Sequence, residues 1–205
     1  MAGQESGSAG MRMWGLWTCP VHECPELLAE PVAVAFAAAR GESAWAEQAH
    51  VAAIEPELAD TASCCAAYEV PAQASANCVV IAGKRGGTVR VVACVALATT
   101  RVDVNGVVRS WLGVRKASFA TQDEVTTATG MAYGGITPIG LPADWPVLVD
   151  TAAVEQEHVV LGSGMRGSKL VLPGSTLSGL PGAEVCPGLA RPVAEDFGDG
   201  LRPVP

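Results

Sequence analysis

The sequence predicts an α+β fold with a mixed β-sheet. Segments with helical spacing of apolar residues alternate along the chain with strand-like runs, and two of these runs are joined by a short turn rich in glycine. The chain has 205 residues, of which 49% are hydrophobic and 17% are charged. This composition supplies enough apolar side chains for a single domain with its own core.

The amino-terminal half is expected to begin with a flexible leader over 1–13, because its first residues lack the basic start and apolar middle of a signal peptide. Residues 14–25 show no regular pattern. A helix is predicted over 26–40, with Pro31 in an early turn or dividing the helix. A short strand over 50–54 and a helix over 56–68 follow. The next predicted element is a hairpin of strands 77–82 and 89–97, with its turn at 83–87.

The second half is expected to begin with a helix over 103–112, for which Asp103 is the N-cap. Thr121 and Glu124 fit a capping box that opens another helix, and Gly130 is placed to end it. The remaining predicted elements are strands over 145–149, 158–161, 169–172 and 182–186, with a short helical turn over 175–180. Residues 187–205 are rich in proline, glycine and acidic residues and are predicted to form a tail, so the domain spans 14–186.

The charge is unevenly distributed along the chain. The formal net charge is −8, yet residues 84–116 contain seven basic residues and a single acidic one. A basic face of this kind can contact a phosphate backbone, and the alternative is a set of ordinary solvated charges. The longest apolar run, 31–39, is too short to span a bilayer, which needs about 20 residues. The sequence therefore predicts no membrane association and a cytoplasmic location.

The cysteines are expected to be reduced. Their number, seven, is odd, and no export signal is evident. Cys78 and Cys94 lie in apolar strand-like runs, where a thiol acts as a small hydrophobic side chain. Cys19, His22 and Cys24 bring together three potential zinc ligands, but a structural zinc site needs a fourth ligand, usually from a second cluster. This segment is therefore interpreted as a surface loop, and no metal or cofactor is expected.

Two glycine-rich segments carry the strongest functional signal. Residues 129–140 hold four glycines and one proline among apolar residues, and the second segment is Gly162-Ser-Gly-Met-Arg-Gly167. The second matches the dinucleotide-binding pattern in form, but that pattern needs a following helix, and residues 168–172 are strand-like. These glycines favour a pocket lined by backbone N–H groups, which can stabilise an oxyanion; the alternative is a pair of tight turns. No histidine lies in a recognisable nucleophile motif.

Between residues 75 and 185 the order of these features resembles the YbaK / prolyl-tRNA synthetase-associated editing domains. Four segments carry the resemblance: Val79-Val-Ile-Ala82 followed by a turn and a second strand, Arg115-Lys-Ala-Ser-Phe-Ala120 before the helix that ends at Gly130, Gly134-Gly-Ile-Thr-Pro-Ile-Gly140, and Pro146-Val-Leu-Val-Asp150 followed by Gly162-Ser-Gly and Arg166-Gly167. The third segment matches the family's G-x-x-x-P loop, with Gly134 and Pro138 at its ends.

The resemblance implies a single domain with a mixed, barrel-like β-sheet flanked by helices. It implies an aminoacyl-tRNA deacylase, a trans-editing hydrolase that cleaves the ester between a wrong amino acid and the 3′-terminal adenosine of a tRNA. In this family the G-x-x-x-P loop positions the aminoacyl carbonyl, water or the tRNA 2′-hydroxyl completes the reaction, and no metal is required. The implied partners are the aminoacylated 3′ end of a tRNA and, as a candidate, an aminoacyl-tRNA synthetase.

The resemblance, together with the basic segment over 84–116, assigns the site residues to three groups. The catalytic group is Asn77, Gly134, Gly135, Ile136, Thr137 and Pro138. The residues that line or brace the substrate pocket are Asp150, Ser163, Gly164 and Arg166. The residues that contact the tRNA backbone are Lys84, Arg85, Arg115 and Lys116.

Asn77 departs from the family pattern, because the family typically has a lysine at this position that contacts the terminal nucleotide. Asparagine donates and accepts hydrogen bonds, but it is shorter and carries no charge. The alternative function is therefore a non-catalytic module that binds an aminoacyl-tRNA end or an amino-acid derivative. A third function, hydrolysis of a small-molecule ester or thioester, would require activity without tRNA.

Overall fold

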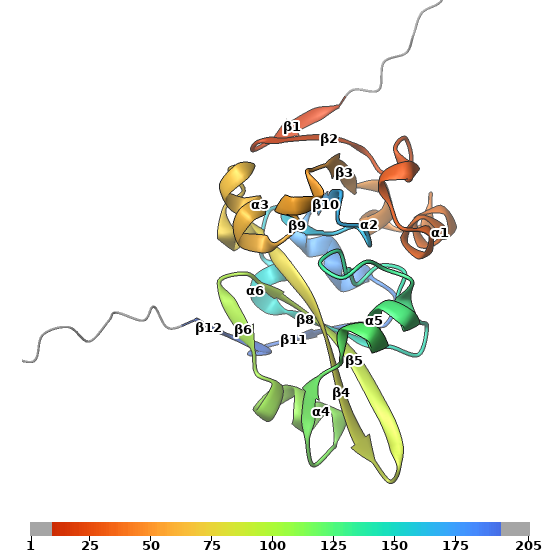
Figure 1. Cartoon of the computed structure of the whole chain (residues 1–205), viewed down its shortest axis with the longest axis vertical. Helices are drawn as coiled ribbons and strands as arrows, with labels where there is room; N and C mark the ends of the chain where they lie inside the picture. Colours follow the sequence, from red (N-terminus) through yellow and green to blue (C-terminus); the bar gives the residue numbers. More distant parts are fainter. Residues whose placement is uncertain (1–9, 194–205) are drawn as a thin grey trace, which may run out of the picture.

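The computed structural model describes residues 10–193, which form an α+β fold (Figure 1). One sheet is antiparallel and contains, in spatial order, β1 (Met11–Met13), β2 (Leu16–Pro20), β3 (His50–Ala53), β10 (Ser168–Leu172) and β9 (Val159–Gly162). The second sheet is mixed and contains β11 (Ala183–Cys186), β8 (Val147–Asp150), β5 (Thr88–Leu97), β4 (Ala76–Arg85) and β7 (Ala117–Phe119). The predicted α+β class is confirmed, and within the described residues both sheets remain open.

The two sheets meet at the start of β4. Ser75, the residue before this strand, forms a parallel bridge with Val160 of β9. Figure 1 shows β4 and β5 running from this junction to the opposite end of the molecule. The first residues of β4 are therefore held beside β9 and β10, although about 80 residues separate these strands in sequence.

The core follows the alternation of side chains along the strands of the second sheet. Ala93 and Val95 of β5 face a central cluster that also contains Leu161 and Leu170 of the first sheet. The intervening Cys94 faces the opposite side, where it packs with neighbouring apolar residues in a separate cluster. Burial raises the pKa of the Cys94 thiol to about 12, so this side chain behaves as the small hydrophobic residue that the sequence predicts.

The predicted hairpin is confirmed, with a shorter turn than expected. β4 and β5 pair in antiparallel register from Ala76 opposite Leu97 to Arg85 opposite Thr88. Only Gly86 and Gly87 connect them, with φ angles of +59° and +86°. These left-handed conformations suit glycine and match the twist of the two strands, so pairing continues through residues that the sequence pattern left in the turn.

Six α-helices lie in the described part of the chain, and none of its helices is long and apolar enough to cross a bilayer. Pro31 lies in the first turn of the longest helix, which therefore begins at Glu30 rather than at residue 26. A separate 3₁₀ turn, η1 (Pro25–Leu27), precedes it. The helices are α1 (Glu30–Ala39), α2 (Ala44–Glu47), α3 (Thr61–Ala67), α4 (Arg109–Leu112), α5 (Gln122–Thr129) and α6 (Thr151–Val154).

Side-chain caps explain where three of these helical segments begin. The predicted helix over 56–68 is divided, because Asp60 accepts a hydrogen bond from the Ser63 N–H and starts α3 separately from the turn η2 (Pro56–Leu58). Asp103 is the predicted cap, but it opens a π-helical segment, η4 (Val104–Val108), before α4. The capping box of α5 is formed by Thr121 and Glu124, as predicted.

The described chain extends beyond the predicted domain at both ends. Residues 11–13 form β1, and part of the segment expected to be irregular forms β2. At the other end β12 (Ala190–Pro192) pairs with β6 (Thr100–Val102), so the tail cannot begin at residue 187. Arg191 of β12 also forms an ion pair with Asp103, the residue after β6, with 2.8 Å between Nη2 and Oδ2. The rest of the predicted leader and tail, 1–9 and 194–205, lies outside the described residues.

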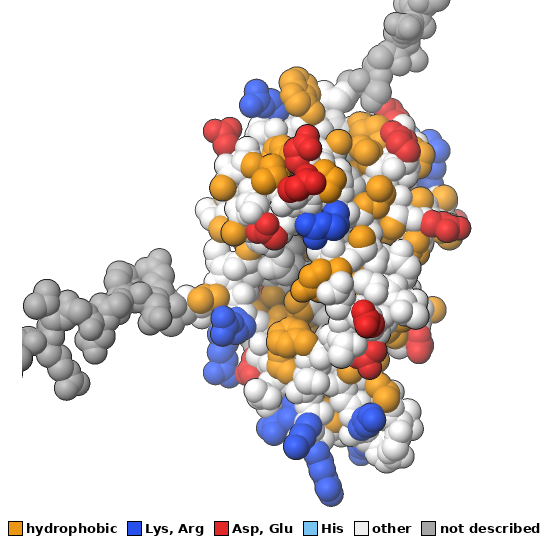
Figure 2. All heavy atoms as spheres, viewed as in Figure 1, with side chains coloured by type: hydrophobic (Ala, Val, Ile, Leu, Met, Phe, Trp, Pro, Cys, Tyr) orange, Lys and Arg blue, Asp and Glu red, His pale blue; other side chains and the backbone are white. Residues whose placement is uncertain are grey.

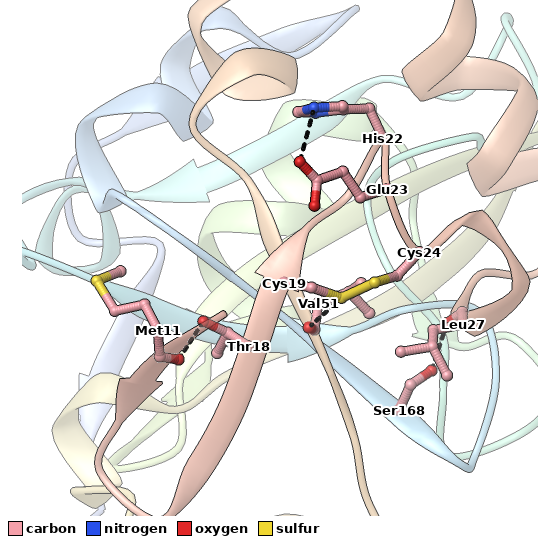
Figure 3. Close-up of a disulfide and its surroundings, with 9 residues drawn as sticks. All are labelled: Met11, Thr18, Cys19, His22, Glu23, Cys24, Leu27, Val51 and Ser168. Atoms are coloured by element: carbon pink, nitrogen blue, oxygen red, sulfur yellow. Dashed lines mark hydrogen bonds and ion pairs between the residues drawn. A yellow bond between two sulfur atoms is a disulfide. The ribbon is translucent and has the colours of Figure 1, made fainter. Parts of the chain in front are cut away.

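Cys19 and Cys24 form a disulfide, which corrects the prediction that the thiols are reduced (Figure 3). The chain turns back after β2, and the two Cα atoms come within 6.5 Å of each other, a distance that a disulfide can bridge. Residues 10–193 contain no cluster of three or more His, Cys, Asp or Glu side chains that could hold a metal ion. The disulfide fastens the end of β2 to η1.

Candidate functional site

One cavity combines the first glycine-rich loop, the start of β4 and the wall formed by β9 and β10. Its volume is about 360 Å³. Among the predicted site residues, Asn77, Gly134, Ile136 and Arg166 line it. The complete lining is Ala59, Asp60, Thr61, Ser75, Ala76, Asn77, Cys78, Val79, Tyr133, Gly134, Ile136, Val160, Gly162, Arg166 and Lys169.

The glycine-rich loop begins with a tight turn over residues 132–135. The Gly135 N–H donates to the Ala132 carbonyl oxygen at 2.9 Å, and Gly134 occupies the third position with a φ of +85°. This position of a type II turn requires a left-handed conformation, which glycine adopts without steric cost. The turn presents the Gly134 backbone to the cavity.

The two glycine-rich segments are hydrogen-bonded to each other through their backbones. The Gly164 N–H donates to the Gly135 carbonyl oxygen at 2.7 Å, and the Ala132 N–H donates to the Gly164 carbonyl oxygen at 2.8 Å. A Cβ atom at Gly162 would collide with the backbone of Gly135 and Ile136. The loop can therefore lie against β9 only because Gly162 has no side chain.

Backbone donors of the loop are unpaired within residues 10–193. The N–H groups of Tyr133, Gly134 and Ile136 have no hydrogen-bond acceptor there, and all three residues line the cavity. Thr137 and Pro138 are buried behind them, which supports the exposed part of the loop. Convergent backbone donors of this kind can hold a carbonyl oxygen and stabilise the negative charge that develops on it.

Asn77 lies near the start of β4, at the exposed edge of the cavity. Its Oδ1 accepts a hydrogen bond from the Thr61 hydroxyl at 2.7 Å. This contact orients the side-chain amide and leaves its NH₂ group as the part that can donate to a ligand. Asn77 is therefore a hydrogen-bond donor without charge at the mouth of the site.

The second glycine-rich segment contributes two lining residues, Gly162 and Arg166, and one internal support. Arg166 donates to the Tyr133 carbonyl oxygen at 3.3 Å and to the Pro56 carbonyl oxygen at 3.0 Å, so its guanidinium connects the first glycine-rich loop to η2. Ser163 is fully buried, and its hydroxyl lies 2.7 Å from that of Ser168. The Ser168 hydroxyl also bonds the Leu27 carbonyl oxygen next to the disulfide loop (Figure 3).

Asp150 does not lie at the cavity, and its position does not support the predicted contact with substrate. This carboxylate is buried at the end of β8. One oxygen accepts from the Ala152 N–H at 3.0 Å and caps α6, and the other accepts from the Ala190 N–H at 2.9 Å. An acidic residue directly after an apolar strand looks like a site residue in the sequence, but here it satisfies backbone donors.

The predicted nucleic-acid contacts lie apart from the cavity. Lys84 and Arg85 end β4, and Arg115 and Lys116 precede β7, which pairs with β4 at Gly83. None of the four lines the cavity. Figure 2 shows Lys and Arg side chains gathered at the end of the molecule that the β4–β5 hairpin and α4 form. We call Lys84, Arg85, Arg115 and Lys116 the basic end.

Sequence reasoning missed Lys169, which lies in β10 and lines the cavity. The side chain is almost fully buried, and its Nζ donates to the Ala59 carbonyl oxygen at 2.7 Å. Burial lowers the pKa of Lys169, because the charged form loses hydration. The signal available in the sequence was a single lysine inside an otherwise apolar strand.

Known proteins resemble this chain in sequence and in fold. A family model described as an aminoacyl-tRNA editing domain matches residues 55–179. The structure is similar to the hypothetical protein APE2540, with 21% identity over 69% of this chain and 90% of that one, and a TM-score of 0.61. It is also similar to a protein proposed as a trans-editing enzyme for prolyl tRNA synthetase, with 21% identity over 67% and 83% of the two chains and a TM-score of 0.58.

A scaffold protein used for computational grafting of linear epitopes has the same fold. It shares 19% identity with this chain over 78% of this chain and 95% of its own, with a TM-score of 0.65. The identities with all three structures are low, so these similarities establish the fold alone.

Replacement of Gly162 by alanine is expected to displace the glycine-rich loop. The new Cβ atom would collide with the backbone of Gly135 and Ile136, and overpacking of this kind costs about 1–3 kcal/mol. Urea unfolding should show the lower stability, and amide NMR spectra should show shifted resonances over 134–138. The matched control is Gly179→Ala, whose Cβ would lie 3.8 Å from its nearest neighbour, in Trp45. Unchanged loop resonances in Gly162→Ala would contradict the described packing.

Proposed function

The chain belongs to the aminoacyl-tRNA editing domain family, and from this membership we propose that it is an aminoacyl-tRNA deacylase. The proposed reaction hydrolyses the ester between an incorrect amino acid and the 3′-terminal adenosine of a tRNA. The observation that carries the proposal is that Gly134 and Ile136, whose N–H groups have no acceptor within residues 10–193, line the same cavity.

In the proposed mechanism, the Gly134 and Ile136 N–H groups bind the carbonyl oxygen of the ester. A water molecule, positioned by the tRNA 2′-hydroxyl, adds to the carbonyl carbon, and the oxygen becomes an oxyanion. Collapse of this intermediate breaks the bond to the ribose oxygen, which takes up a proton, and releases the free amino acid. One well-placed donor contributes about 3 kcal/mol to such an oxyanion.

Other residues of the site would position the tRNA end. The Asn77 NH₂ group is free to contact the terminal adenosine, because Thr61 occupies the amide oxygen. Arg166 would brace the acyl pocket through the carbonyl oxygens that it already binds, and Ser163 and Gly164 would hold the loop from behind. Gly135, Thr137 and Pro138 would fix the loop rather than touch the ester, because they are buried.

We include residues 14–54 in the same functional unit. β3 pairs with β10, the strand that carries Lys169 into the cavity. The basic end would bind the phosphate backbone of the tRNA at a distance from the ester. A synthetase that produces the mischarged tRNA is the candidate protein partner.

The alternative function is a binding module that recognises an aminoacylated tRNA end without hydrolysing it. The observation that favours it is the uncharged side chain of Asn77 at the cavity mouth. The two functions share the fold and the pocket, and they differ in whether bound ester is turned over.

A panel of labelled aminoacyl-tRNAs that includes Ala-tRNA(Pro) and Cys-tRNA(Pro) tests the main proposal. We expect release of one amino acid well above the uncatalysed rate. Gly134→Val should reduce this release at least about 100-fold, because a branched residue is strained at a φ of +85° and its Cβ would collide with the Arg166 guanidinium. Gly179→Ala serves as the control. No release from any panel member, with tRNA binding intact, would exclude the deacylase.

Variants at Asn77 separate the enzyme from the binding module. If Asn77 contributes to hydrolysis, Asn77→Ala should lower kcat/KM about 10-fold, as expected for one lost hydrogen bond in a buried complex. Asn105→Ala, at an exposed position in η4, is the matched control. A wild-type protein without activity and an Asn77→Lys variant that hydrolyses ester would instead support the binding module.

The basic end should add a salt-dependent contribution to tRNA affinity. In Lys84→Gln/Lys116→Gln, the slope of log K against log salt concentration should fall by about 1 for each lysine. Hydrolysis of an aminoacylated adenosine that lacks the tRNA body should be unaffected, because neither lysine lines the cavity. The control is Arg40→Gln, at the exposed end of α1. An unchanged slope would show that these lysines do not contact tRNA.

A further inference from the structure

We propose that Lys169 binds an anionic oxygen of the aminoacylated 3′ end in the cavity. The inference rests on the proposed function. It assigns to β10 a positively charged contact that Asn77 of β4 does not provide.

Although the charge of Asp60 acts on it, Lys169 is buried without an ion pair in the described chain. The residue is 8% exposed, and none of the ion pairs within residues 10–193 includes it. Its one hydrogen bond there goes to the Ala59 carbonyl oxygen, and an ammonium group has three N–H donors. A buried cation is destabilising unless it is paired, so this position suits a residue that acquires an anionic partner on binding.

The nearby carboxylate does not act as that partner. Asp60 lines the same cavity, but its Oδ1 accepts the Ser63 N–H at 3.0 Å and caps α3. The ionisable side chains that line the cavity are those of Asp60, Cys78, Tyr133, Arg166 and Lys169. Burial raises the pKa of the Cys78 thiol, which keeps it neutral, so two cations face one carboxylate and the cavity carries a positive excess.

The backbone brings Lys169 to the glycine-rich loop. Lys169 of β10 lies opposite Gly162 of β9 in the antiparallel register. Gly162 is in turn packed against the backbone of Gly135 and Ile136, and the Gly134 and Ile136 amides line the same cavity as Lys169. Lys169, Gly134 and Ile136 therefore border one cavity, and we place a single ligand against all three.

The 3′ end of an aminoacyl-tRNA offers two anionic oxygens to such a group. One is the oxyanion that forms on the ester carbon during hydrolysis, and the other is the phosphate of the terminal nucleotide. An aminoacylated adenosine without a phosphate separates them, since it retains only the first. Loss of an oxyanion contact lowers kcat, whereas loss of a phosphate contact raises KM.

The test measures kcat/KM of wild type and of Lys169→Met on two substrates, aminoacyl-tRNA and aminoacylated adenosine. The substitution keeps the length of the side chain and removes its charge. We expect kcat/KM on aminoacyl-tRNA to fall at least about 100-fold, the lower range for one oxyanion donor. An equal fall on the adenosine substrate would assign the oxyanion, and a fall confined to tRNA would assign the phosphate. Arg40→Met, which removes an exposed cation, should leave both substrates unaffected.

Folding of the variants is part of the test. Lys169→Met should unfold in urea at a midpoint no lower than that of wild type, because it removes a buried charge. Lys169→Gln, whose amide can donate a hydrogen bond, is the second variant if the methionine variant fails to fold. Activity within threefold of wild type in a folded variant would overturn the proposal. Failure of both variants to fold would also overturn it, because Lys169 would then serve the fold.

The proposal remains testable if wild type hydrolyses no member of the panel. A stable analogue with an amide in place of the ester then replaces the substrate. Binding by wild type that weakens at least about 10-fold in Lys169→Met would support the role of Lys169 in a binding module. Equal binding by the two proteins, or no binding by wild type, would overturn it.

Discussion

The site depends on contact between backbones from which side chains are excluded. A Cβ atom on Gly162 would collide with the backbone of Gly135 and Ile136, and a Cβ atom on Gly135 would collide with the backbone of Met165. The hydrogen bonds between Gly135, Gly164 and Ala132 then fix the distance between the two segments. Because this packing and these hydrogen bonds hold both segments in place, the loop amides can be positioned at the cavity before a ligand binds.

Residues outside the matched editing region complete this arrangement. The family model begins at residue 55, yet α1 packs against both glycine-rich segments. The Ala29 N–H donates to the Ser163 carbonyl oxygen, and a Cβ at Gly140 would collide with the Pro31 backbone. Through the Ser168 hydroxyl and Leu27, the loop closed by the disulfide is joined to β10. The amino-terminal segment therefore supports the rear wall of the cavity.

Local patterns predicted the local structure well. The β4–β5 hairpin, the capping box at Thr121 and the end of α5 at Gly130 depend on residues close in sequence, and each was recognisable. The Cys19–Cys24 disulfide was missed, because reasoning from the absence of an export signal says nothing about how the chain turns after β2. The hydrogen-bond partners of Asp150 and the burial of Lys169 could not be predicted for a related reason, since they are set by segments distant in sequence.

The length of β4 sets the distance between the cavity and the basic end. Asn77 at the cavity and Lys84 in the basic end lie on the same strand, seven residues apart. At about 3.3 Å per residue they are separated by roughly 23 Å, close to the length of seven stacked nucleotides at about 3.4 Å each. Side chains alternate between the two faces of a strand, so residues seven apart point to opposite faces. A ligand that contacts both Asn77 and Lys84 would therefore have to span this length and cross from one face of β4 to the other.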